Sequence, residues 1–133
     1  MAVLRTLAPG VLVAGQIDLA DLQTARDLGV VRIISNRPDG EEYGQPDAAT
    51  MADAARALGL DYVHAPVRGM PGPDAVAAIG AALSEGTPVL IHCKSGMRST
   101  VAWALAASQR GQSRDEIVAA AAGAGYDLSS LPL

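Results

Sequence analysis

Short runs of apolar residues alternate along this chain with longer stretches that have helical spacing. Strands are predicted where apolar or β-branched residues follow one another between turn residues, over 11–14, 30–34, 61–65 and 89–91. Helices are predicted behind capping residues over 18–28, 47–59, 74–83 and 99–109, and from Ser113 onward. We interpret the residues before 11 as a strand and turn that enter the fold, and residues 123–133 as a loosely packed tail.

The order of these elements predicts the fold. Strands and helices alternate, and the run 89–91 is apolar throughout, as in a strand that is buried on both faces. This pattern favours a single α/β domain with a mainly parallel central sheet flanked by helices. Ligands of such sheets bind at the carboxyl ends of the strands. We therefore expect the loops 37–44 and 66–73 and the turn after Ile91 to meet there.

Composition narrows the class of partner. The chain has 133 residues, half of them hydrophobic, which is enough for one domain with a packed core. Its 14 acidic and 10 basic residues give a net charge of −4, which argues against a nucleic-acid partner. No apolar run approaches the roughly 20 residues that cross a bilayer, so we expect no membrane partner and a cytoplasmic location. With one cysteine and two histidines, we expect no metal and no cofactor.

The single cysteine lies in the turn between the strand 89–91 and the helix that follows it. This turn reads His92-Cys93-Lys94-Ser95-Gly96-Met97-Arg98-Ser99-Thr100. The backbone amides of residues 94–98 can curl around an anion at the N-terminus of the helix, and Gly96 permits the tight curl. The amides and the Arg98 guanidinium favour the thiolate of Cys93, which is the nucleophilic form. The sequence therefore predicts a reactive cysteine beneath a bound anion.

Neighbouring residues have expected roles in this site. The planar fork of Arg98 can hold two oxygens of a tetrahedral anion. Either Ser99 or Thr100 can donate a hydroxyl to the cysteine sulfur, and His92 can brace the loop by bonding backbone carbonyls. Arg37 is expected to add positive potential at the mouth. The predicted anion-binding set is Lys94, Ser95, Gly96, Met97, Arg98 and Ser99.

A proton donor is harder to find. Cleavage of a phosphomonoester normally needs a general acid for the leaving oxygen, and residues 65–73 contain no carboxylate. Asp74 ends that loop and is one candidate catalytic residue, with helix capping as its alternative role. Asp39, in the loop 37–44, is a second candidate, with turn formation as its alternative role. Glu41 and Glu42 rank behind both.

The cysteine turn resembles the signature His-Cys-x-x-Gly-x-x-Arg-Ser/Thr of the cysteine-dependent tyrosine and dual-specificity phosphatases. Four residues separate Cys93 from Arg98, where that superfamily has five. A six-residue loop opened by the cysteine is instead what rhodanese-type sulfurtransferases use to cradle a persulfide. Together with Asn36-Arg37-Pro38-Asp39-Gly40-Glu41 and Gly15-Gln16-Ile17-Asp18, the turn makes most of the chain similar to the β-lactamase-hydrolase-like, phosphatase-like domain family.

This resemblance implies a tyrosine-phosphatase-like fold and favours a phosphatase. Cys93 would attack a phosphomonoester, and water would release phosphate from the cysteinyl-phosphate. Members of the family are also described as sulfur transferases, and the loop length favours that alternative, with a persulfide on Cys93. A third possibility is a non-catalytic module that binds phosphate or sulfate groups. In each case the partner is a small anionic or phosphorylated molecule.

Overall fold

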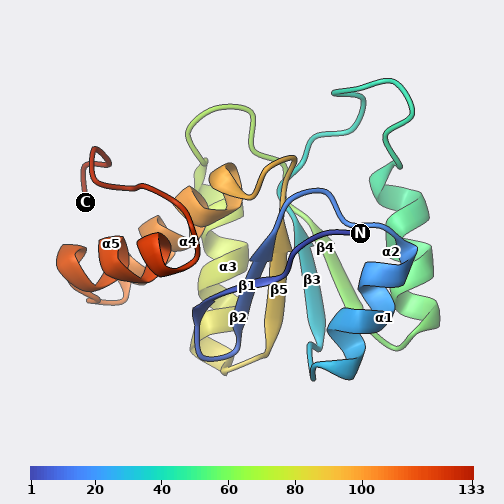
Figure 1. Ribbon diagram of the computed structural model, residues 1–133, viewed down its shortest axis with the longest axis horizontal. Helices are drawn as coiled ribbons and strands as arrows, with labels where there is room; N and C mark the ends of the chain where they lie inside the picture. The colour runs from blue at the N-terminus through green and yellow to red at the C-terminus, as the bar shows by residue number, and fades with distance from the viewer.

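The computed structural model describes residues 1–133 as a five-stranded sheet with helices on both faces (Figure 1). The strands are β1 (Arg5–Ala8), β2 (Val11–Ala14), β3 (Arg32–Ser35), β4 (Asp61–His64) and β5 (Val89–His92). The helices are α1 (Leu19–Asp27), α2 (Ala48–Ala57), α3 (Pro73–Glu85), α4 (Met97–Gln109) and α5 (Arg114–Gly123). The strand order is β1-β2-β5-β3-β4, and only β1 pairs antiparallel. The predicted α/β fold with a mainly parallel sheet is confirmed.

Side chains of the central strands alternate between two hydrophobic cores. Val13, Ile34 and Ile91 belong to the larger cluster, which packs against α3, α4 and α5. Ile33 and Leu90 belong to the second cluster, beneath α1 and α2 on the opposite face (Figure 1). Because successive residues of a strand point to opposite faces, a strand covered on both sides is apolar at every position. This explains why the run 89–91 shows no alternation.

Helix starts follow the predicted punctuation in α1, α2 and α5, whereas α4 begins at Met97, two residues before its predicted start. Asp18 and Ser113 begin α1 and α5 with complete capping boxes. In α3, however, Gly72 is the N-cap and Pro73 the first helical residue, so the expected cap by Asp74 is wrong. Proline suits the first helical position because its φ is already helical and it needs no hydrogen bond there. Asp74 consequently lies exposed in the first turn.

The residues after α5 pack more closely than the expected loose tail. Ala124 and Leu128 are buried in the larger hydrophobic cluster. Between them, the Tyr126 N–H donates to the Ala121 carbonyl at 2.8 Å. Burial of apolar side chains on both sides of Tyr126 fixes this part of the chain, which places Tyr126 beside the loop that follows β5.

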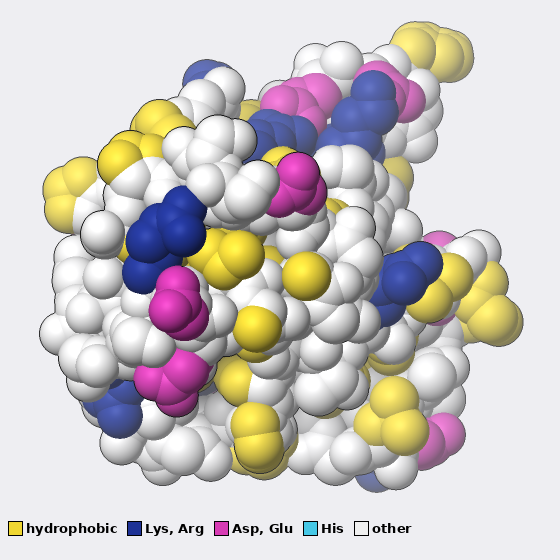
Figure 2. All heavy atoms as spheres, turned by 60° about the vertical axis from the view of Figure 1, so that its left-hand side comes forward, with side chains coloured by type: hydrophobic (Ala, Val, Ile, Leu, Met, Phe, Trp, Pro, Cys, Tyr) yellow, Lys and Arg dark blue, Asp and Glu magenta, His cyan; other side chains and the backbone are white.

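Charged side chains are dispersed over the surface. On the face shown in Figure 2, basic side chains occur in small separate groups, most of them beside acidic ones, and apolar side chains form small islands. None of the helices has the length and apolar character needed to cross a membrane.

Candidate active site

The loops that follow the four parallel strands meet at one end of the sheet. The β5 loop supplies Cys93 and leads into α4, which carries Arg98. Arg98 contacts Glu41 in the β3–α2 loop and the Val67 carbonyl in the β4–α3 loop. The predicted meeting of these three segments is confirmed.

Cys93 and Gly96 form the centre of the site. Cys93 is the first residue after β5 and is fully buried. Its Sγ accepts a hydrogen bond from the Gly96 N–H at 3.1 Å. Gly96 has φ +94° and is the N-cap of α4, a conformation that glycine adopts without strain. Of the amides predicted to curl around an anion, that of Gly96 is therefore aimed at the sulfur.

The β2–α1 loop supports the cysteine loop from the side. The Gln16 N–H donates to the Lys94 carbonyl at 3.0 Å. A Cβ at Gly15 would lie 2.8 Å from the same carbonyl oxygen. Only glycine permits this close approach of the two backbones, which gives a structural reason for the Gly15-Gln16 pair noted in the sequence.

The two hydroxyls expected at the sulfur are used elsewhere. Thr100 Oγ1 donates to the Gly96 carbonyl at 2.7 Å, one helical turn earlier. Ser99 Oγ donates to Asn36 Oδ1 at 2.7 Å, and both residues are fully buried. The expectation of a hydroxyl on Cys93 is therefore wrong, because nearer backbone and amide acceptors take both protons. Ser99 supports the site through Asn36 rather than touching an anion with its side chain.

His92 does not brace the loop as expected. Neither ring nitrogen has a hydrogen-bond partner. Because neighbouring strand residues point to opposite faces, the ring lies on the other side from Cys93. There it lines a cavity of about 10 Å³ with Arg37 and Ser35. Burial lowers the pKa of His92 to about 4, so the ring is neutral at physiological pH.

Arg98 is held by two groups from different loops. Its Nη1 donates to Glu41 Oε2 at 2.7 Å and to the Val67 carbonyl at 2.7 Å, and its Nη2 donates to Glu41 Oε1 at 2.8 Å. The hydrogen bond with Glu41 and the nearby Cys93 both raise the pKa of Arg98. Glu41 thus holds the edge formed by the two terminal nitrogens. This arrangement leaves the Nε edge for an anion, which the planar fork can bind.

Three cations and two carboxylates surround the mouth of the site. Glu41 also accepts from Arg37 Nε at 3.0 Å, and Glu42 pairs with Lys94 and, at 3.4 Å, with Arg37 Nη2. Hydrogen bonds from Arg98 lower the pKa of Glu41 to about 2, and the Lys94 ammonium lowers the pKa of Glu42. Both carboxylates are therefore ionised at neutral pH. The expected positive potential stays a prediction, because each of the three cations is paired with one or both of these carboxylates.

The candidate general acids lie apart from the sulfur. Asp39 Oδ1 accepts from the Ala48 N–H at 2.8 Å and so holds the start of α2. Asp74 is exposed and makes no hydrogen bond or ion pair with the cysteine loop. Glu41 is the carboxylate that reaches Arg98, and it is ionised. As arranged, the structure brings no protonated carboxylate to the site.

The remaining members of the predicted anion-binding set lie at the rim. Lys94, Ser95 and Met97 are exposed, and the Met97 N–H donates to Ser95 Oγ at 3.3 Å. Lys94 points outward to its Glu42 partner. From these residues an anion would therefore meet mainly backbone amides.

Asn36 and Tyr126 support the site, but the sequence did not predict these roles. Asn36 links three loops, because its side chain accepts from Ser99, donates to the Ala65 carbonyl at 2.8 Å, and its N–H donates to the His92 carbonyl at 2.7 Å. Its place directly after a buried strand was the available signal. Tyr126, whose hydroxyl donates to the Ser95 carbonyl at 2.9 Å, lay in the supposed tail and gave no signal.

Comparisons with known proteins agree with this geometry. The model of the family "Beta-lactamase hydrolase-like protein, phosphatase-like domain" matches residues 3–112. The chain is 36% identical over 119 residues to the beta-lactamase hydrolase-like protein of Agrobacterium fabrum, covering 87% of this chain and 28% of that protein. It is 41% identical over 104 residues to the Xylella fastidiosa protein of the same name, covering 75% of this chain and 24% of the relative. The chain thus spans less than a third of the length of either relative.

Comparison with solved structures shows which fold the chain has. A phosphatase candidate from Neisseria meningitidis superimposes with a TM-score of 0.80 at 30% identity, covering 95% of this chain and 91% of that one. The kinase associated phosphatase, solved with its catalytic-site cysteine replaced by serine, gives a TM-score of 0.72 at 15% identity, covering 96% and 86%, which shows the fold alone. The chain therefore belongs to the phosphatase-like domain family of beta-lactamase hydrolase-like proteins and has a tyrosine-phosphatase-like fold.

Proposed function

We propose that this domain is a phosphatase that uses Cys93 as its nucleophile on a small phosphomonoester. The observation that carries the proposal is the Gly96 amide aimed at the Cys93 sulfur, 3.1 Å away, at the N-terminus of α4. A helix N-terminus with inward amides binds anions, and Cys93 is near enough to Arg98 to contribute to raising its pKa. Membership of a phosphatase-like family supports the same activity.

The reaction would proceed in two displacements. The Cys93 thiolate attacks phosphorus, a sulfur–phosphorus bond forms, and the bond to the leaving oxygen breaks. Water then attacks phosphorus, the sulfur–phosphorus bond breaks, and inorganic phosphate and the thiolate are released. The loop amides and Arg98 stabilise the charge on the transferring group.

The absence of a protonated carboxylate at the sulfur limits the substrate class. Without a proton donor, the leaving oxygen departs as an anion and takes its proton from water. Aryl phosphates, whose leaving groups are weak bases, are therefore the preferred substrates. Asp74, which makes no hydrogen bond or ion pair, stays the candidate acid for poorer leaving groups, whereas Asp39 is already engaged at α2.

Release of p-nitrophenol from p-nitrophenyl phosphate tests the proposal. Cys93→Ser is expected to abolish turnover, and Arg98→Lys to lower kcat by at least about 100-fold, because an ammonium cannot replace the guanidinium fork. Arg56→Lys, an exposed change on α2, is the matched control and keeps full activity. Turnover that survives Cys93→Ser would contradict the mechanism.

One observation favours a second candidate function, sulfur transfer. The loop from Cys93 to Arg98 has the six residues typical of rhodanese-type enzymes. The Cys93 thiolate would attack the outer sulfur of thiosulfate, forming a persulfide and releasing sulfite as the sulfur–sulfur bond breaks. Mass spectrometry would then show an adduct of about 32 Da that Cys93→Ser lacks. A domain that forms no adduct and hydrolyses no aryl phosphate, yet binds sulfate, would be a binding module.

A further inference from the structure

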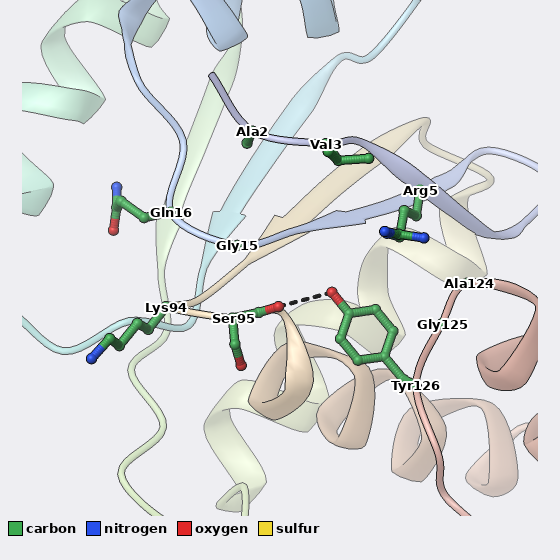
Figure 3. Close-up of a pocket in the computed structure, with 10 residues that line it drawn as sticks. All are labelled: Ala2, Val3, Arg5, Gly15, Gln16, Lys94, Ser95, Ala124, Gly125 and Tyr126. Atoms are coloured by element: carbon green, nitrogen blue, oxygen red, sulfur yellow. Dashed lines mark hydrogen bonds between the residues drawn. The ribbon is translucent and has the colours of Figure 1, made fainter.

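Tyr126 contacts the cysteine loop at the Ser95–Gly96 peptide. Its hydroxyl donates to the Ser95 carbonyl at 2.9 Å (Figure 3). Its ring covers Gly96 so closely that a Cβ there would lie 2.8 Å from Cζ and would collide with the hydroxyl oxygen. The charge of Cys93 contributes to raising the pKa of Tyr126, after burial, which is the main cause. Tyr126 is thus a close neighbour of Cys93.

The bonded carbonyl and the sulfur-binding amide belong to one peptide unit. A trans peptide is planar, so the Ser95 carbonyl and the Gly96 N–H point in opposite directions. Tyr126 holds the carbonyl outward, and the same plane then directs the N–H inward to Cys93 Sγ. Rotation of this peptide would turn a carbonyl oxygen toward the sulfur and repel a thiolate.

Gly96 makes such a rotation easy. A peptide flip changes ψ of the preceding residue and φ of the following one, and glycine tolerates both signs of φ. Gly96 has φ +94° and no side chain to resist the change. The glycine that permits the tight loop therefore also permits the flipped orientation of the Ser95–Gly96 peptide, unless another group holds this peptide in place.

We propose that Tyr126 is a positioning residue that locks the Ser95–Gly96 peptide in the orientation that activates Cys93. The lock rests on the proposed role of Cys93 as the nucleophile. Tyr126 is itself fixed by the buried residues Ala124 and Leu128 on either side of it. It lies outside residues 3–112, the part of the chain that matches the family, so the lock is supplied by the segment after α5.

Tyr126→Phe tests the proposal because it removes only the hydroxyl. The rate of Cys93 alkylation by iodoacetamide is measured from pH 5 to 9, and Gly96 amide exchange is followed by nuclear magnetic resonance. We expect the alkylation profile to shift to higher pH, with the rate at pH 7 reduced roughly five-fold, the factor that one hydrogen bond typically controls. The Gly96 amide is expected to exchange several times faster.

Two control variants separate positioning from general stability. Tyr43→Phe makes the same chemical change at a fully exposed tyrosine and leaves both readouts unchanged. Leu60→Ala destabilises the second hydrophobic cluster, and we expect a lower Tm with an unaltered alkylation profile. An unchanged profile and unchanged Gly96 exchange in Tyr126→Phe would overturn the lock. Faster Gly96 exchange with no phosphatase activity in any variant would instead support the lock and refute the proposed function.

Discussion

Replacement of Asn36 by alanine removes a buried link between three loops of the site. Asn36 is fully buried, and its side chain satisfies the Ser99 hydroxyl at 2.7 Å and the Ala65 carbonyl at 2.8 Å. In Asn36→Ala both groups stay buried without a partner. Each unsatisfied group costs about 1–3 kcal/mol, so we expect the free energy of unfolding to fall by about 2–5 kcal/mol.

Urea and thermal unfolding measure this loss. For a domain of this length, about 1 kcal/mol corresponds to about 3–5 °C in Tm, so Asn36→Ala is expected to lower Tm by about 6 °C or more. Ser99→Ala leaves only one buried acceptor, Asn36 Oδ1, without its hydrogen bond, and is expected to lower the free energy of unfolding by about 1–2 kcal/mol. Ser84→Ala deletes an exposed hydroxyl that binds Arg110, and as the matched control it changes stability by less than about 0.5 kcal/mol.

The double variant decides whether Asn36 and Ser99 act together. If their hydrogen bond contributes as the distance indicates, the combined loss is smaller than the sum by about 1–2 kcal/mol. Losses that add to within about 0.5 kcal/mol would refute the coupling. They would show that Asn36 acts only through the Ala65 carbonyl.

Two further predictions concern charge. Glu41→Gln removes one negative charge from the mouth of the site, and a unit charge about 6 Å away changes anion affinity by roughly three- to ten-fold. We therefore expect calorimetry at low salt to show tighter sulfate binding in this variant, whereas the control Asp53→Asn, an exposed change on α2, leaves sulfate binding unchanged. Weaker sulfate binding in Glu41→Gln would contradict the prediction. Burial lowers the pKa of His92 to about 4, below the value near 6.5 of the unfolded chain, so the unfolded state binds the proton first. The contribution of neutral His92 to the free energy of unfolding is fully present above about pH 6.5, and this free energy falls by up to about 3 kcal/mol as the pH is lowered towards 4. Urea titrations follow this fall, His92→Gln flattens it, and a pH-independent wild type would contradict it.

Local signals in the sequence predicted the framework well. The helix caps at Asp18 and Ser113 and the apolar run 89–91 depend on near neighbours, and the structure confirms them. The cysteine turn was also predictable, because Gly96 permits the tight curl next to Cys93, although α4 begins at Met97 rather than at residue 99. Supersecondary rules then placed the turn at the carboxyl end of the sheet.

Long-range partners were not predictable. Arg98 meets Glu41 across 57 residues and Ser99 meets Asn36 across 63, and no local pattern encodes those distances. The side-chain roles failed for the same reason. Thr100 and Ser99 each had several possible acceptors, and only the packed structure shows which one lies nearer than the sulfur.

The structure shows where the cysteine loop lacks one residue relative to the phosphatase signature. The Cys-x-x-Gly half is complete, and its amide reaches the sulfur, so the missing residue falls between Gly96 and Arg98. Arg98 is therefore the second residue of α4, and each residue of a helix turns a side chain by about 100°. Relative to a five-residue spacing the guanidinium leaves the helix in a different direction, where Glu41 and Val67 hold it.

The amide at the sulfur and the Arg98 guanidinium therefore have different chemical tasks. A persulfide needs the amides that reach the sulfur, whereas a transferring phosphoryl group also needs a cation on its outer oxygens. The choice between phosphorus and sulfur therefore depends less on loop length than on whether Arg98, while paired with Glu41, still offers its Nε edge to an anion. Since both bonds to Glu41 use the terminal nitrogens, Glu41 leaves the Nε edge open, which supports the proposed phosphoryl transfer.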